Sequence, residues 1–139
     1  MTICRGLPGS GKTTIAKQLL YHARVAGRKC NHYEADMYFM RDGVYQFDMN
    51  NLADAHDWCR SSVEDCMQEG CDAIVSNTFT TIRELRPYFE IAKEFGVVPN
   101  VITCQSNFGS IHDVPQETLA KMKARFTYDL SPLFGEFKV

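Results

Sequence analysis

The chain has 139 residues, of which 45% are hydrophobic and 23% charged, and its formal net charge is -2. These values fit one globular domain spanning residues 1–139 and exclude a disordered or fibrous chain. The charge gives no general attraction to nucleic acid or anionic lipid, so any polynucleotide would have to be bound locally. The sequence holds no apolar run long enough to span a bilayer, and we therefore expect no membrane partner.

The six cysteines are dispersed through apolar segments, without the paired spacing of a zinc site or a disulfide framework. We therefore expect small buried thiols and a reducing, cytoplasmic location. Because the first predicted strand begins beside Met1, we also expect no removable leader.

The first part of the chain predicts a strand, a helix and a second strand. Residues 2–5 form a short apolar run that leads into glycines, and residues 13–26 carry apolar side chains at helical spacing up to Gly27. Residues 30–35 predict the second strand, and a strand-helix-strand order implies a parallel crossover. Residues 36–50 are rich in aspartate, glycine and aromatics, which predicts a functional loop with one short helical turn.

The remainder alternates helices and strands. Residues 51–69 predict a long helix with Leu52, Ala55, Cys59, Val63 and Cys66 or Met67 on one face, ended by Gly70. A strand over 72–76 follows, and then a capping box from Thr81 to Glu84 that opens a helix running to Gly96. We predict a strand over 101–104, a polar loop over 106–113 and a helix over 115–125, whereas 127–139 shows no clear preference.

This order predicts an α/β fold with three layers and a mostly parallel sheet of four or five strands. In such sheets ligands bind beyond the carboxyl ends of the strands. The loops that begin near Gly6, Asp36 and Asn77 should therefore converge.

The clearest motif is GLPGSGKT, which follows the first strand and opens the first helix, and it matches the phosphate-loop pattern GxxxxGK[ST] in full. Inward-facing backbone N–H groups and the helix N-terminus favour phosphate oxygens. Lys12 would contact the β and γ phosphates, and the Thr13 hydroxyl would hold Mg2+. The predicted ATP-binding residues are Gly6, Leu7, Pro8, Gly9, Ser10, Gly11, Lys12, Thr13 and Thr14.

Phosphoryl transfer also needs a carboxylate near the acceptor hydroxyl or the metal, and Asp36 at the end of the second strand suits that role. Tyr38 and Arg41 are candidates for contacting the acceptor. Asn77 and Thr78 stand where many phosphate-loop proteins place an acidic residue; they would hold water, phosphate or acceptor, or only cap a turn.

Arginine commonly clamps a transferred phosphoryl group, and Arg125 and Arg83 are candidates for that role, each with a solvated surface position as the alternative. The aromatic side chain of Trp58 and the imidazole of His56 follow the predicted loop. They would either stack on a base or pack beneath the loop.

Several stretches carry a family resemblance: GLPGSGKTT, ADMYF, DGVYQFD, LADAHDWC, IVSNTFT, RPYFEIAKEFG and IHDVPQETLAKMKARF. Over nearly the whole chain the sequence resembles the AAA_33-type P-loop kinase-like family, which includes phage ATP-binding proteins and, more distantly, the 5′-hydroxyl polynucleotide kinase of T-even phages. The resemblance implies a P-loop NTPase fold, ATP and Mg2+ as cofactors, and the host cytoplasm as location if the chain is phage-encoded.

In the polynucleotide kinases the aspartate after the second strand is the general base, and by position the resemblance gives that role to Asp36. The T-even enzymes have an arginine at the position of Phe39, an aspartate at that of Asn77, and basic lid residues where this chain has Gln105 to Gly109. Their acceptor-clamping and transition-state arginines are therefore not matched here.

Three functions follow from these observations. The first is a kinase that transfers the γ-phosphoryl group of ATP to a hydroxyl of a nucleic-acid end or a nucleoside-like molecule. The second is a nucleotide-binding regulatory or interaction protein with little transferase activity, which the unmatched arginines favour. The third, a plain ATPase, is disfavoured because the chain has no room for an additional coupling subdomain.

Overall fold

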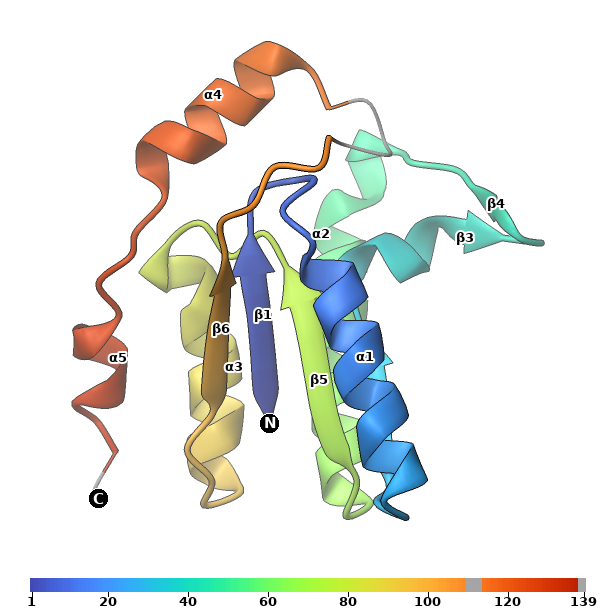
Figure 1. Cartoon of the computed structure of the whole chain (residues 1–139), viewed down its shortest axis with the longest axis vertical. Helices are drawn as coiled ribbons and strands as arrows, with labels where there is room; N and C mark the ends of the chain where they lie inside the picture. The colour runs from blue at the N-terminus through green and yellow to red at the C-terminus, as the bar shows by residue number, and fades with distance from the viewer. Residues whose placement is uncertain (110–113, 138–139) are drawn as a thin grey trace.

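The computed structural model of the protein describes residues 1–109 and 114–137, and Figure 1 shows how its elements are arranged. The elements are, in chain order, β1 (Thr2–Gly6), α1 (Lys12–Val25), β2 (Cys30–Tyr33), the 3-10 helix η1 (Ala35–Phe39), β3 (Met40–Arg41), β4 (Val44–Tyr45), the 3-10 helix η2 (Met49–Asn51), α2 (Leu52–Gln68), β5 (Asp72–Asn77), α3 (Ile82–Glu94), β6 (Asn100–Cys104), α4 (Gln116–Arg125) and α5 (Ser131–Phe134).

The main sheet has four parallel strands in the order β2-β5-β1-β6. Ile3 of β1 pairs with Val75 of β5 on one side and with Val101 of β6 on the other, which fixes the register at the centre. All four strands point the same way, so their carboxyl ends meet at one edge, the upper edge in Figure 1. The prediction of a mostly parallel sheet of four or five strands is confirmed, with four strands in the described residues.

Helices cover both faces of this sheet (Figure 1). On one face α1 packs against the strands through Ala16 and Ala23, which cluster with Cys4 and Ile74. On the other face lies the larger core, which contains Ile3 and Val75 of the sheet, Cys59 and Val63 of α2, and Leu85 and Phe89 of α3. The three-layer α/β prediction is therefore confirmed.

Local signals placed the helices well. Thr81 caps α3 with a capping box, because its hydroxyl accepts from the Glu84 N–H and the Glu84 carboxylate accepts from the Thr81 N–H. The predicted stripe on α2 is buried at Ala55, Cys59, Val63 and Cys66. Leu52, predicted as part of this stripe, is instead 38% exposed at the first residue of the helix.

Residues 30–50 differ from the sequence prediction in two ways. The second strand ends at Tyr33, because the backbone N–H of Ala35 donates to the Asn77 side chain and η1 begins there. The segment 36–50 contains η1 as its helical turn, but also a hairpin of β3 and β4 that was not predicted. Its turn residues Asp42 and Gly43 both have positive φ, and Asp-Gly is a favoured sequence for a two-residue hairpin turn.

Arg5 is fully buried and fastens the chain after α4 to the loop between β5 and α3. Its guanidinium donates to the Phe79 carbonyl at 3.0 and 2.7 Å and lies 4.2 Å from the centre of the Phe126 ring. Burial lowers the pKa of Arg5, but a guanidinium stays charged far above neutral pH. Phe126 directly follows Arg125, the last residue of α4, so the contact of this buried cation with the Phe126 ring helps to hold the end of α4 in place.

All six cysteines are free, and all but Cys71 are buried, as expected of small apolar side chains. Over residues 1–109 and 114–137, none of the helices combines the length and the apolar character that crossing a bilayer requires.

Candidate phosphate-binding and acceptor site

The phosphate loop connects β1 to α1 at the edge where the parallel strands end (Figure 1). Gly9 and Gly11 have φ values of 79° and 93°, in the left-handed region that glycine adopts without strain. A Cβ on Gly9 would collide with the Gly109 backbone, and one on Gly11 would lie 3.1 Å from the Phe108 ring. These glycines therefore allow both the turn and the close approach of the 105–109 segment.

Helix α1 begins at Lys12 directly after this loop, and among the described residues no side chain caps its N-terminus. The first N–H groups of a helix have no partner within the helix, and the helix dipole adds partial positive charge there. A 14-residue helix that starts at a glycine-rich loop is a favourable place for an anion.

Lys12 is half-buried at the base of the loop, where its Nζ donates to the Leu7 carbonyl at 3.4 Å. Burial lowers the pKa of this ammonium, whereas the nearby carboxylates of Glu34 and Asp36 raise it. The structure therefore brings two acidic side chains, from the region following β2, into the electrostatic range of Lys12.

Glu34 is a site residue that sequence reasoning missed. Its Oε2 accepts a hydrogen bond from the Thr13 hydroxyl at 3.3 Å, and its Oε1 accepts one from Ser76 at 3.2 Å. Burial raises the pKa of Glu34, and the hydrogen bonds from Thr13 and Ser76 oppose that shift. A carboxylate thus lies beside the predicted magnesium ligand although the end of β5 is neutral.

His32 completes a hydrogen-bonded chain behind Glu34. Its Nε2 lies 2.6 Å from the Ser76 hydroxyl and 3.3 Å from Glu34 Oε1. Burial lowers the pKa of His32 to about 4, so the ring is neutral near pH 7 and its contact with Glu34 is not an ion pair. Since Ser76 donates to Glu34, neutral His32 donates to Ser76 through Nε2, and the chain orients the carboxylate.

Asp36 lies in η1, two residues after Glu34. Its Oδ1 accepts a hydrogen bond from the Tyr45 hydroxyl at 3.2 Å. Burial raises the pKa of Tyr45 to about 12, and the adjacent Asp36 charge contributes, so Tyr45 keeps its proton and remains a donor. Tyr45 belongs to the β3–β4 hairpin, which therefore reaches back to Asp36.

Asn77 and Thr78, at the end of β5, lie next to the phosphate loop and to the turn that carries Asp36. Asn77 is buried, and its Oδ1 accepts from the Ala35 N–H at 2.8 Å, while its Nδ2 donates to Cys59 at 3.6 Å. The Thr78 carbonyl accepts from the Gly6 N–H at 3.2 Å. Asn77 therefore positions the turn that carries Asp36, and Thr78 joins β5 to the phosphate loop.

Replacing Asn77 by alanine should destabilise the protein by about 1–3 kcal/mol, because it leaves the buried Ala35 N–H without an acceptor. Urea unfolding followed by circular dichroism measures this, with Asn100→Ala as the control because Asn100 is exposed. Equal unfolding midpoints for the two variants would contradict the positioning role of Asn77.

The other predicted substrate residues lie in and around the hairpin. Tyr38 is half-buried, with its ring 6.2 Å from that of Trp58, and Trp58 in turn contacts Tyr33. Trp58 therefore packs beneath the loop, and His56 is exposed on the outer side of α2. Arg41 is exposed in β3.

The two arginines expected to clamp the phosphoryl group lie on different helices. Arg83 is exposed in the first turn of α3. Arg125 ends α4, and its Nε donates to the Thr80 hydroxyl at 2.9 Å, while Thr80 donates to Glu84. Arg125 is thus bonded to the β5–α3 loop, and a role in transfer for either side chain stays a prediction.

The donor set suits a magnesium ion held largely by substrate oxygens. Over the described residues, histidine, cysteine, aspartate and glutamate form no cluster of three or more that could enclose a metal. Mg2+ keeps several waters and is usually held by one or two protein oxygens together with phosphates. The Thr13 hydroxyl, hydrogen-bonded to Glu34, fits that requirement.

Three features define a P-loop NTPase fold. They are a buried parallel sheet, a glycine-rich loop at the edge where its strands end, and a lysine and threonine at the start of the following helix. The family model for AAA_33, described as an AAA domain, matches residues 1–108. The chain therefore belongs to the AAA_33 family.

Comparisons with known proteins agree on this fold. Human NEDD4-binding protein 2 is 30% identical over 95 residues, which is 68% of this chain but only 5% of that protein. The APS kinase CysC of Mycobacterium tuberculosis, as a Cys556Ala mutant, has a TM-score of 0.61 at 13% identity, covering 89% of this chain and 94% of its own. A chain of the Pnkp1/Rnl/Hen1 complex has a TM-score of 0.57 at 19% identity, covering 86% of this chain and 37% of that one.

Proposed function

We propose that the chain is an ATP-dependent kinase that transfers the γ-phosphoryl group of ATP to a hydroxyl on a nucleic-acid end or a nucleoside-like molecule. The observation that carries the proposal is the convergence of Lys12 with the carboxylates of Glu34 and Asp36 at the phosphate loop. A protein that only bound Mg2+ and the nucleotide would need the loop, Lys12 and a carboxylate near the metal, whereas the additional carboxylate of Asp36 suits an acceptor hydroxyl.

The geometry supports the following roles. Backbone N–H groups of the loop and Lys12 bind the triphosphate. Bound Mg2+ would neutralise phosphate charge, with Thr13 as its protein ligand and Glu34 orienting that ligand and its waters. Asp36 accepts the proton of the acceptor hydroxyl as that oxygen bonds to the γ-phosphorus and the bond from phosphorus to the ADP oxygen breaks.

A nucleotide-binding regulatory protein is the second candidate. It is supported by the exposed positions of Arg41 and Arg83 and by the hydrogen bond that holds Arg125 to Thr80, since none of these arginines contacts the phosphate loop in the described structure. Unless a substrate draws one of these arginines to the γ-phosphate, none of the three would balance transition-state charge, which would then rest on Lys12 and bound Mg2+. Transfer would then be slow.

Incubation of the protein with ATP labelled on the γ-phosphate separates the candidates, including the ATPase. The acceptor panel is 5′-hydroxyl DNA, 5′-hydroxyl RNA and free nucleosides. A kinase moves label into at least one acceptor at a rate above its release as free phosphate. Tight ATP binding with no label transferred to any acceptor would overturn the proposal in favour of a regulatory protein, and release as phosphate alone would indicate an ATPase.

Glu34→Gln keeps the shape of the side chain and removes its charge, so we expect the apparent Mg2+ affinity of the ATP complex to fall by about 10- to 100-fold. ATP binding without Mg2+ should be unchanged or slightly tighter, because a negative charge beside the phosphates is lost. Titration of Mn2+ followed by electron paramagnetic resonance measures the metal affinity directly. The control is Glu90→Gln on the exposed side of α3, and equal metal affinities in the two variants would rule out this role.

A further inference from the structure

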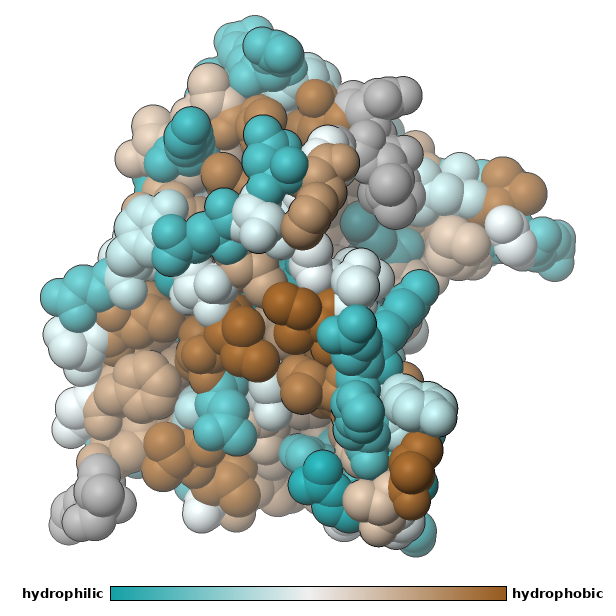
Figure 2. Space-filling view, in the orientation of Figure 1, coloured by the Kyte–Doolittle hydropathy of each residue, from teal (hydrophilic) through white to brown (hydrophobic). Residues whose placement is uncertain are grey.

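The hairpin of β3 and β4 projects from the molecule close to Asp36. Figure 1 shows it extending from η1 on the side of α1 that faces away from β6, and Figure 2 shows apolar surface on the projecting part. The segment from β3 to the start of α2 exposes five large apolar side chains, those of Met40, Val44, Phe47, Met49 and Leu52. Apolar side chains that gather on a surface mark binding sites, whereas single ones need no explanation. The hairpin is therefore a candidate binding surface outside the phosphate loop.

Three aromatic rings form one packed unit at the base of the hairpin. The buried ring of Phe39 meets those of Tyr45 and Phe47 edge-on, with 6.3 and 5.1 Å between ring centres. The rings of Tyr45 and Phe47 are nearly parallel, at an angle of 17° and 6.4 Å between centres. The Gln46 N–H donates to the Phe39 carbonyl at 2.8 Å, which holds the segment 45–47 in place. Phe47, which is 48% exposed, therefore presents a positioned aromatic ring to solvent.

This aromatic unit is joined directly to the carboxylate proposed to accept the acceptor proton. The Tyr45 hydroxyl donates to Asp36 Oδ1 at 3.2 Å. A molecule whose hydroxyl reaches Asp36 thus has the remainder of its structure beside the hairpin. Aromatic side chains offer a face on which any nucleobase can stack. An acceptor that carries a base can use Phe47, whereas a simple sugar or alcohol gains nothing from its ring face.

The charge around the aromatic unit disfavours a polynucleotide. Residues 34–57 contain one guanidinium, that of Arg41, and six carboxylates, those of Glu34, Asp36, Asp42, Asp48, Asp54 and Asp57. Proteins that bind polynucleotides neutralise the phosphates with lysine and arginine. A chain of phosphodiesters beside the hairpin would instead meet charge of its own sign. An uncharged acceptor avoids this repulsion.

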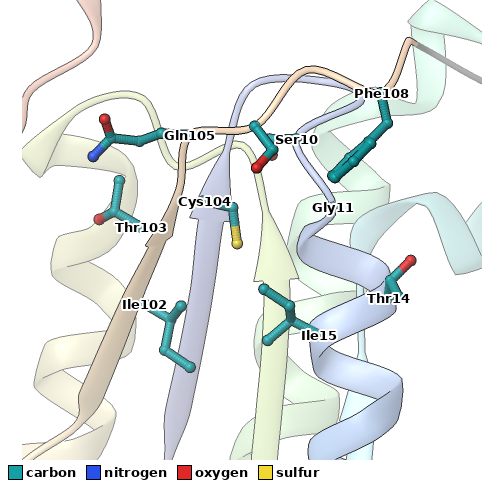
Figure 3. Close-up of a pocket in the computed structure, with 10 residues that line it drawn as sticks. Ser10, Gly11, Thr14, Ile15, Ile102, Thr103, Cys104, Gln105 and Phe108 are labelled. Atoms are coloured by element: carbon teal, nitrogen blue, oxygen red, sulfur yellow. The ribbon is translucent and has the colours of Figure 1, made fainter.

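Two other features that could recognise a nucleic acid lie away from the hairpin. In Figure 1 the basic end of α4 is at the opposite side of the molecule, where Arg125 is bonded to Thr80. The exposed ring of Phe108 borders a cavity of about 600 Å³ between α1 and β6 (Figure 3), on the other side of α1 from the hairpin. Recognition of the acceptor beside Asp36 therefore depends on the hairpin itself.

We propose that the acceptor is an uncharged nucleoside whose base stacks on Phe47 while its hydroxyl reaches Asp36. The inference rests on the proposed kinase function and narrows the acceptor from a nucleic-acid end or nucleoside-like molecule to a free nucleoside. The acceptor oxygen bonds to the γ-phosphorus, the bond from phosphorus to the ADP oxygen breaks, and Asp36 takes the proton. The products are ADP and a nucleoside monophosphate. Phe47 is a positioning residue, since it holds the base and takes no part in the transfer.

The first test removes the ring and keeps the apolar contact with Phe39. Phe47→Leu should raise the KM for a nucleoside by about 5- to 10-fold, the lower part of the range for a lost base–aromatic stack, with kcat and ATP affinity little changed. Phe47→Trp should restore the KM. Tyr21→Ala removes a ring that is 65% exposed on α1 and is the control for loss of a surface ring. Equal nucleoside KM values in Phe47→Leu and Tyr21→Ala would overturn the stacking site.

The second test compares a free nucleoside with a 5′-hydroxyl oligonucleotide that begins with the same nucleoside. At low salt kcat/KM should be higher for the nucleoside by about fivefold or more, the effect of one like charge at contact distance in water. Added salt should narrow this difference, because it screens the repulsion.

The opposite result would overturn the inference and leave the kinase function standing. It is an oligonucleotide preferred over the nucleoside, with activity that falls as salt rises, as for polynucleotides held by cations. Absence of transfer to either acceptor, with ATP still bound, would instead overturn the proposed function and this inference with it.

Discussion

Asp36→Asn should slow phosphoryl transfer by about 10²- to 10⁴-fold, the usual contribution of a positioned general base. Asparagine retains an oxygen that can accept the Tyr45 hydrogen bond, so the turn that carries residue 36 should keep its conformation. The loss would then report proton acceptance and not misfolding. Single-turnover transfer of labelled phosphate to the preferred acceptor measures the chemical step.

Affinity for ATP should remain within about twofold in the same variant, because the phosphates are held by the loop and Lys12 and not by Asp36. Asp65→Asn, on the exposed side of α2, is the control for loss of a carboxylate. If Asp36→Asn turned over at the rate of this control, Asp36 would not be the general base.

Lys12→Ala should weaken ATP binding by about 10- to 150-fold, because hydrogen bonds to charged groups contribute roughly 1.5–3 kcal/mol. The ammonium lies near the half-buried carboxylates of Glu34 and Asp36, so its removal also leaves their negative charge uncompensated near the phosphates. Equilibrium dialysis with labelled ATP measures the change.

Lys17→Ala removes an exposed ammonium from the same helix and is the matched control. Far-UV circular dichroism of both variants checks that α1 is intact. Retention of ATP by Lys12→Ala at the level of Lys17→Ala would contradict the role of the phosphate loop.

Much of the fold was predictable because its signals are local. The phosphate loop is one contiguous motif, the capping box at Thr81 spans four residues, and the α2 stripe repeats at helical spacing. The hairpin at Asp42 and Gly43 also had a local signal, the Asp-Gly pair, but the aromatic and glycine content around it favoured a loop.

The site was harder to predict because its contacts join distant segments. Glu34 reaches Ser76 only because β2 pairs with β5 in a register that brings Tyr33 beside Val75. The sequence shows a neutral end to β5 but not that the carboxylate of Glu34, directly after β2, lies beside it. Phe108 likewise meets Gly11 only through the return of the chain after β6, a contact that no sequence period indicates.

The central claim is that the loop from Gly6 to Thr13 binds a nucleoside triphosphate together with Mg2+. Calorimetric titration of the unaltered protein with ATP, with and without Mg2+, tests it most directly. The proposed site predicts saturable binding of one ATP per chain that tightens when Mg2+ is added. Absence of binding heat at millimolar ATP, or identical affinity with and without the metal, would contradict it.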